Sequence, residues 1–326
     1  MNPAFSVILL TTLIGIGQGL FLALWTGQVY SLVEVLPAPD SHRFYVIGSA
    51  ISLAFLVAGL LASFFHLGHP ERAWRSAAMW RTSWLSREVI VLPMFMGVVF
   101  CYGMAHYFGW NTPQIPLRGH VILEPSLMIG TVGVALCFAL FICTAMIYAC
   151  IKFLQEWHSS LTVINYFLLG CASGFMLATV FSAWAAPDLV TFYGGWTVLL
   201  VLAALATRTA SLLRNARLRP ISNMQTAIGV RHPRIVQKSQ GAMGGSFNTR
   251  EFFHGKPERF LRAVKWGFLL LTFPLPILLL LAGLLFDSPP LLLAAFAVQY
   301  LGLLAERWYF FAQANHPQNL YYQHIS

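Results

Sequence analysis

Long apolar runs alternate with short polar segments along the whole chain. Each run is long enough to cross the roughly 30 Å hydrocarbon core of a bilayer. Because lipid offers backbone groups no hydrogen-bond partner, each run must be a helix. The pattern predicts an all-α membrane protein, a single integral membrane domain over residues 1–326. Its eight transmembrane helices are expected at about Ser6–Val33, Phe44–Phe65, Glu88–Phe108, Ser126–Ile151, Leu161–Trp184, Leu189–Leu213, Ala263–Phe286 and from the turn at Asp287–Pro290 to Ala312.

Composition excludes a soluble protein. Apolar residues make up 58% of the chain and charged residues only 10%, with a mean hydropathy of +0.68. The first run is too long for a signal sequence and lacks a basic segment before it, so we expect it to be the first spanning helix. The five cysteines lie in or at the ends of apolar runs and form no CxxC pair, so no iron–sulfur cluster is expected in this chain.

The positive charges indicate the orientation. An even number of helices places both termini on one side, and that side holds 18 of the 20 Lys and Arg residues. Only Arg43 and Arg118 belong to the opposite side. The positive-inside rule therefore predicts that both termini are cytoplasmic.

A basic segment, residues 208–265, is expected as a long cytoplasmic loop between the sixth and seventh helices. It contains twelve Lys or Arg residues against the two acids Glu251 and Glu258. One interpretation is topology together with attraction to anionic lipid. The other is a docking surface for a soluble subunit. The residues predicted to dock a partner are Arg75, Arg81, Arg87, Arg231, Arg234 and Lys238.

A second polar stretch, His66–Glu88, lies between the second and third predicted helices. It is crowded with arginine, tryptophan and histidine. These residues gather at membrane interfaces regardless of function, and an ion pair between Glu88 and a nearby arginine is one interpretation. Polar groups next to lipid also indicate a functional site.

The residue types in this stretch suit the binding of a quinone, which needs an apolar slot, hydrogen-bond donors and a proton path to water. An imidazole titrates near neutral pH and a carboxylate can relay a proton, which points to His66 and Glu88. Either Ser83 or Ser86 is expected to cap the third helix. The predicted quinone site, which doubles as a docking loop over residues 66–88, consists of His66, Gly68, Pro70, Arg72, Trp80, Trp84, Ser86 and Glu88.

Another acid, Glu306, lies late in the eighth predicted helix. An intramembrane glutamate is a candidate for a proton relay together with Glu88. An ion pair between Glu306 and the adjacent Arg307 is an equally good interpretation, and both stay open.

Two motifs resemble one known family. The string HLGHPERA, residues 66–73, followed by LSRE, residues 85–88, resembles the membrane anchor subunit of the dimethyl sulfoxide reductase family. The ending AERWYFFAQANHPQNLYYQ, residues 305–323, is similar to the version of this subunit in cytoplasmic sulfite dehydrogenases. The resemblance covers essentially the whole chain. The basic segment is a departure, because it is much shorter in the dimethyl sulfoxide reductase anchor.

The resemblance implies a subunit of the bacterial inner membrane that binds no metal itself. Such a subunit anchors an iron–sulfur subunit and a molybdopterin catalytic subunit, and exchanges electrons between the last cluster and ubiquinone or menaquinone. The family's quinone-site histidine and glutamate fall on His66 and Glu88. The chain is then not catalytic for the substrate half-reaction, but it is the site of quinone chemistry.

Three functions fit these features to different degrees. Catalytic partners on the cytoplasmic side fit the sulfite dehydrogenase type, which reduces quinone. The first alternative is a quinol-oxidising anchor of the dimethyl sulfoxide reductase type. The second is a membrane transporter, but transporters place their ionisable groups near the bilayer midplane, whereas those of this chain gather toward one interface.

Overall fold

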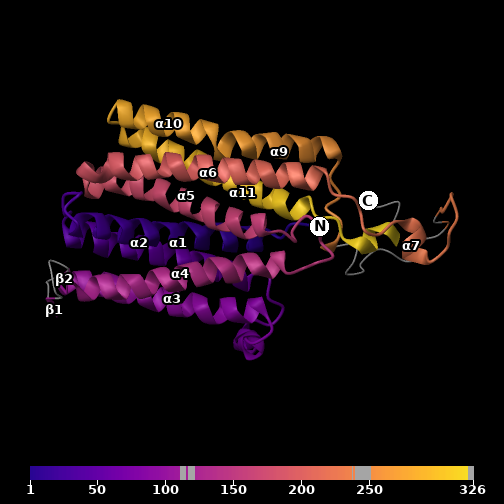
Figure 1. The fold of residues 1–326 in the computed structure, drawn as a ribbon, viewed down its shortest axis with the longest axis horizontal. Helices are drawn as coiled ribbons and strands as arrows, with labels where there is room; N and C mark the ends of the chain where they lie inside the picture. The colour runs from indigo at the N-terminus through magenta and orange to yellow at the C-terminus, as the bar shows by residue number, and fades with distance from the viewer. Residues whose placement is uncertain (111–114, 117–121, 237, 239–250, 322–326) are drawn as a thin grey trace.

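The computed structural model describes residues 1–110, 115–116, 122–236, 238 and 251–321. Within these residues, eight helices are long and apolar enough to cross a membrane, which confirms the expected all-α architecture. The helices lie side by side along the long axis of the molecule (Figure 1). The spans are α1 (Phe5–Leu32), the π-helical η1 (His42–Val46) with α2 (Ile47–Phe64), α3 (Trp84–Tyr107), α4 (Pro125–Ala149), α5 (Ser160–Ala185), the 3₁₀ helix η3 (Pro187–Leu189) with α6 (Val190–Ala216), α9 (Glu258–Thr272) with α10 (Pro274–Leu285), and α11 (Pro289–Ala312).

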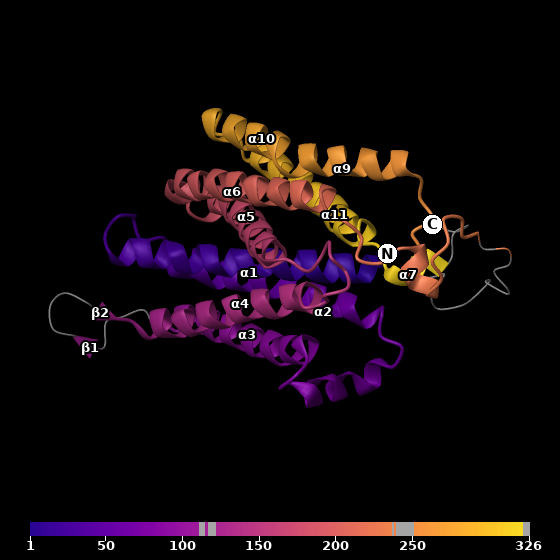
Figure 2. The ribbon, with the colours of Figure 1, turned by 45° about the vertical axis from the view of Figure 1, so that its right-hand side comes forward.

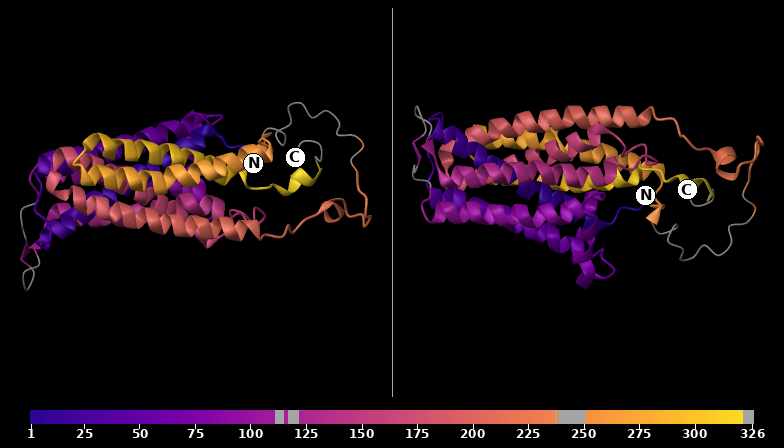
Figure 3. Two further views of the ribbon diagram at one scale, coloured as in Figure 1. Left: turned by 90° about the horizontal axis from the view of Figure 1, so that it is seen from above. Right: turned by 60° about the horizontal axis from the view of Figure 1, so that its bottom comes forward.

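The two ends of the bundle differ. Both termini lie at one end, which we call the terminus end, as an even number of spans requires (Figures 1 and 2). The same end carries the 3₁₀ helix η2 (Pro70–Met79), the short helix α7 (Met224–Ile228) and the 3₁₀ turn η4 (Pro317–Tyr321). The opposite end carries a small antiparallel pair, β1 (Ile115–Pro116) with β2 (Ile122–Leu123). Figure 3 shows the same arrangement from two further sides.

Helices α1 and α5 form the centre of the bundle. Both are mostly buried, whereas the other spans bury about a third of their residues. The two helices cross so closely that a methyl group built on Gly174 would collide with the carbonyl carbon of Gly19. Small residues allow such backbone contact between membrane helices. Aromatic rings, among them Phe21 and Phe95 with centroids 5.3 Å apart, fill the adjoining core.

The seventh span is broken. Helix α9 ends at Thr272 and α10 begins at Pro274, because proline has no N–H to continue the helical hydrogen bonds. Helix α11 packs against both pieces. Its Gly302 lies directly at the break, where an added methyl group would be 2.5 Å from the backbone nitrogen of Thr272.

The structure corrects the bounds of the basic segment. Helix α6 continues to Ala216 rather than ending at Leu213, and α9 begins at Glu258 rather than Ala263. The connection is therefore residues 217–257, of which 237 and 239–250 lie outside the described residues. The prediction ended α6 too early because its last turns carry arginines. Arg214 is accommodated there by donating to the carbonyl oxygens of Gln155 and His158.

We predict that Gly174→Ala lowers the stability of the purified protein by about 1–3 kcal/mol, because the new methyl group pushes α1 and α5 apart. Gly195→Ala in α6 is the control, since an added methyl group there has no neighbour within 4 Å and alanine favours the helix. Thermal unfolding in detergent measures both. Equal melting temperatures for the two variants would contradict the close crossing.

Candidate functional site

The segment between α2 and α3 is an exposed turn at the terminus end. Its helix η2 has no buried residue. Arginine side chains lie over neighbouring tryptophan rings, with the guanidinium carbon and ring centroid 5.5 Å apart for Arg75 and Trp74, 5.3 Å for Arg81 and Trp80, and 4.2 Å for Arg87 and Trp84. Arg87 also donates to the carbonyl oxygens of Trp80 and Arg81, at 2.9 and 2.8 Å. Arg87 therefore fastens the turn to the start of α3.

Four of the predicted quinone-site residues, His66, Gly68, Pro70 and Arg72, are exposed on this turn. Arg72 lies 3.6 Å from the carboxylate of Glu71, which also accepts from His69. Shielding by neighbouring atoms lowers the pKa of His66 below its ordinary value. The imidazole is consequently neutral at neutral pH and offers one donor and one acceptor.

Trp80, just after η2, is exposed as well, whereas Trp84, Ser86 and Glu88 lie deeper. Ser83 caps α3 by accepting from the N–H of Ser86 at 3.4 Å, so the first of the two expected caps is the observed one. Ser86 and Glu88 are buried within the first turns of α3, and Trp84 is half-buried at its start. No hydrogen bond or ion pair among the described residues joins His66 to Glu88. The sequence motif therefore divides into an exposed part and a buried part.

Glu88 accepts a short hydrogen bond from the hydroxyl of Thr144 on α4. Both side chains line a cavity of about 20 Å³ inside the bundle, which is about the room that one water molecule needs. The other polar side chains that line it are Thr11, Thr12, Gln18, Tyr166, Ser173 and Arg307. A buried carboxylate thus faces a small polar cavity shared by five helices.

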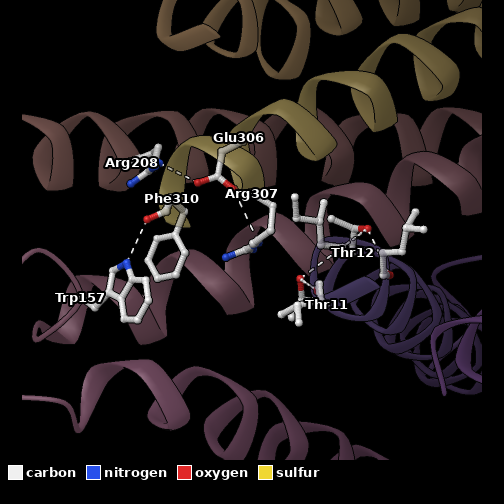
Figure 4. A network of polar contacts seen from close by, with 10 residues as sticks. Thr11, Thr12, Trp157, Arg208, Glu306, Arg307 and Phe310 are labelled. Carbon is white, nitrogen blue, oxygen red and sulfur yellow. Dashed lines mark hydrogen bonds and ion pairs between the residues drawn. The ribbon is translucent and has the colours of Figure 1, made fainter. Parts of the chain in front are cut away.

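Glu306 is buried between two arginines next to this cavity (Figure 4). One carboxylate oxygen lies 2.8 Å from Nε of Arg208 on α6, and the other lies 3.8 Å from Nε of Arg307. The guanidinium of Arg307 in turn lies 3.8 Å from the ring centroid of Tyr166 on α5. The ion pair that the sequence offered as one interpretation is present, while the relay role of Glu306 stays a prediction.

These residues occupy one level of the bundle. Glu88, Thr144, Tyr166, Arg208 and Glu306 each lie about one to two turns from the terminus end of their helix. Arg208 was counted with the aqueous loop, and the structure corrects this, because it is 1% exposed. The sequence signal that could have placed it is the continuation of the apolar run around it.

Part of the basic segment packs on the C-terminal motif. The ring of Phe252 stacks on His316 with centroids 3.8 Å apart, and Asn319 donates to the carbonyl oxygen of Phe252 at 3.2 Å. The predicted docking residues of the basic segment, Arg231, Arg234 and Lys238, take no part in this contact and are exposed. The segment that follows α7 lies at the same end of the molecule as the turn between α2 and α3 (Figure 2).

No group of three metal-ligating side chains lies together in the described part of the chain. Comparison with known proteins finds relatives of this chain. The family model of the DMSO reductase anchor subunit (DmsC) matches residues 1–231. The chain is also 58% identical to the C subunit of the sulfite dehydrogenase of Allochromatium vinosum over 326 residues, which is the full length of both proteins.

We predict that Glu306→Gln destabilises the purified protein by about 3–5 kcal/mol, because it leaves the buried guanidinium group of Arg208 without its counter-charge. Glu71→Gln removes an exposed carboxylate that also pairs with an arginine, and it should leave the stability nearly unchanged. Chemical or thermal unfolding in detergent compares the two. Similar small effects would show that the buried ion pairs carry little of the stability.

Proposed function

Because this chain belongs to the family of DMSO reductase anchor subunits, we propose that it holds an oxidoreductase to the bacterial inner membrane and exchanges electrons between a partner's iron–sulfur cluster and the quinone pool. Quinone exchange is supported by one observation: Glu88 is buried one turn into α3, just after the exposed turn that begins at His66. A titratable side chain is thus available at the surface and a second one inside, on consecutive parts of one motif.

We assign the binding site of the quinone headgroup to the exposed turn. His66 is neutral and has a donor for a carbonyl oxygen. The rings of Trp80 and Trp84 offer flat apolar faces, while Gly68 and Pro70 shape the turn and Arg72 adds a cation. These residue types suit the chemistry of a quinone headgroup, and a bound quinone would supply two-electron, two-proton redox chemistry.

Glu88 is the residue that we assign to proton transfer. It follows the exposed turn by one helical turn of α3 and lines the internal cavity, so a proton that enters the cavity can bind to its carboxylate. Thr144 holds this carboxylate in place through its hydroxyl. His66 is the second candidate, since neutral imidazole accepts and donates protons near neutral pH.

Sulfite oxidation is the proposed source of the electrons. It is supported by the full-length relative, which is named as the C subunit of a sulfite dehydrogenase. The catalytic partner would be a molybdopterin subunit joined to an iron–sulfur subunit. We place both at the terminus end, against Arg75, Arg81, Arg231, Arg234 and Lys238, with Arg87 holding the turn. The alternative, a quinol-oxidising complex of the DMSO reductase type, is favoured only by the name of the family.

The proposal predicts that Glu88→Gln and His66→Ala lower sulfite-dependent reduction of a short-chain quinone by the purified complex by about 100-fold or more. Reduction of an artificial acceptor such as ferricyanide, which draws electrons from the soluble subunits, should be unchanged. The matched control is His69→Ala, which removes an exposed histidine of the same turn. Loss of quinone reduction in His69→Ala to the same extent would contradict the assignment of His66.

The orientation predicts that a reporter fused after the last residue is cytoplasmic. Alkaline phosphatase at this position should be inactive and green fluorescent protein should be fluorescent, because the terminus end carries the excess of Lys and Arg. Active alkaline phosphatase would place the partners outside the cytoplasm and would favour the alternative type of complex.

A further inference from the structure

Four charged side chains are buried together at one level of the bundle, and they are the only buried Lys, Arg, Asp or Glu side chains among the described residues. They are Glu88, Arg208, Glu306 and Arg307. Two are acids and two are bases, from α3, α6 and α11. A buried charge without a counter-charge is costly, so the charges of this group have to balance.

Glu306 can offset only one of the two arginines. Its close partner is Arg208, with 2.8 Å between the oxygen and Nε, whereas Nε of Arg307 is 3.8 Å from the second oxygen. One positive charge is therefore left over, and it belongs mainly to Arg307. The remaining buried acid is Glu88, whose hydrogen-bond partner, Thr144, is neutral.

Arg307 is held so that it faces the cavity of Glu88. Its guanidinium lies over the ring of Tyr166 at 3.8 Å, and Arg307, Tyr166 and Glu88 all line the same 20 Å³ cavity. Figure 4 shows the guanidinium of Arg307 beside the ring of Phe310, 5.4 Å from the ring centroid. Thr11 and Thr12 of α1 are two further residues of the cavity wall. No hydrogen bond or ion pair among the described residues joins Arg307 to Glu88, and what the two side chains share is the wall of this cavity.

We infer that Arg307 is a positioning residue for Glu88: its charge, held by Tyr166 and Glu306, favours the ionised carboxylate on the wall of the cavity that both side chains line. The inference rests on the proposed function, because it explains how Glu88 gives up a proton readily inside the membrane. It also gives the Arg208–Glu306 pair a role, since this pair leaves the charge of Arg307 free to act on Glu88.

The helices around the cavity present few other charges. Helix α1 contributes only neutral polar groups, and Arg87, the neighbour of Glu88 on α3, donates to the exposed turn instead. On the remaining helices, Tyr166 of α5 and Arg307 of α11 line the cavity with Glu88. Cys143 and Tyr148 of α4 lie near Glu88 and Tyr166, and Glu306 of α11 and Arg208 of α6 pair next to Arg307. Arg208 is already paired with Glu306, so the positive charge that offsets an ionised Glu88 has to come from Arg307.

The test measures the protonation of Glu88 without using any quinone. Dicyclohexylcarbodiimide reacts with protonated carboxyl groups in apolar surroundings, and peptide mass spectrometry quantifies the labelled Glu88 in the purified complex at pH 7.5. We expect Arg307→Gln to raise the labelling about tenfold, which corresponds to one pH unit. Arg307→Lys keeps the charge and should label like the natural protein.

Matched variants separate charge from folding. Arg262→Gln removes an exposed arginine of α9 and should leave the labelling unchanged. If Arg307→Gln does not fold, Tyr166→Leu removes the ring that holds the guanidinium and should raise the labelling, while Tyr166→Phe keeps the ring and should not. Unchanged labelling in folded Arg307→Gln, or in Tyr166→Leu, overturns the inference.

This outcome is independent of the proposed function. Raised labelling in a complex that cannot reduce quinone would leave the role of Arg307 standing and reject the proposed electron transfer. Unchanged labelling of Glu88 in Arg307→Gln, together with loss of quinone reduction in Glu88→Gln, would do the reverse.

Discussion

The contact of α1 with α5 through bare backbone is the constraint on which the rest of the structure depends. At Gly19 and Gly174 no side chain separates the two helices, and α2, α4, α6 and α11 pack around the pair. The same crossing shapes the candidate site, because Gly15 and Gly170 belong to the wall of the cavity at Glu88. Small residues that allow close packing of two helices thus also leave room for one polar cavity.

The sequence alone predicted those features of the structure that depend on the local pattern of residues. The apolar runs predicted the eight spans, because a chain in lipid must satisfy its own backbone hydrogen bonds. The motif around His66 and Glu88 predicted the family, which the comparisons confirm. It also placed a serine cap at the start of α3, where Ser83 is observed.

The sequence was insufficient where a side chain is paired across the bundle. Arg208 follows an apolar run and precedes a basic segment, so its charge alone assigned it to water. Its true environment depends on Glu306, which is remote in sequence and adjacent only after α6 packs beside α11. The cavity at Glu88 has the same origin, since five helices contribute to its wall. Pairings of this kind follow from the tertiary arrangement and not from hydrophobic periodicity.

The separation of Glu88 from Arg307 along the chain has a consequence for biosynthesis. Arg307 is made about 220 residues after Glu88, which takes roughly 10 to 45 s at 5–20 residues per second. During this interval α3 has reached the membrane while its counter-charge does not yet exist. If Arg307 favours the ionised carboxylate as inferred above, Glu88 gains this support only after the last helix is inserted. A chain that stops before α11 has Glu88 and Arg208 but neither Glu306 nor Arg307, so the group of buried charges is completed last.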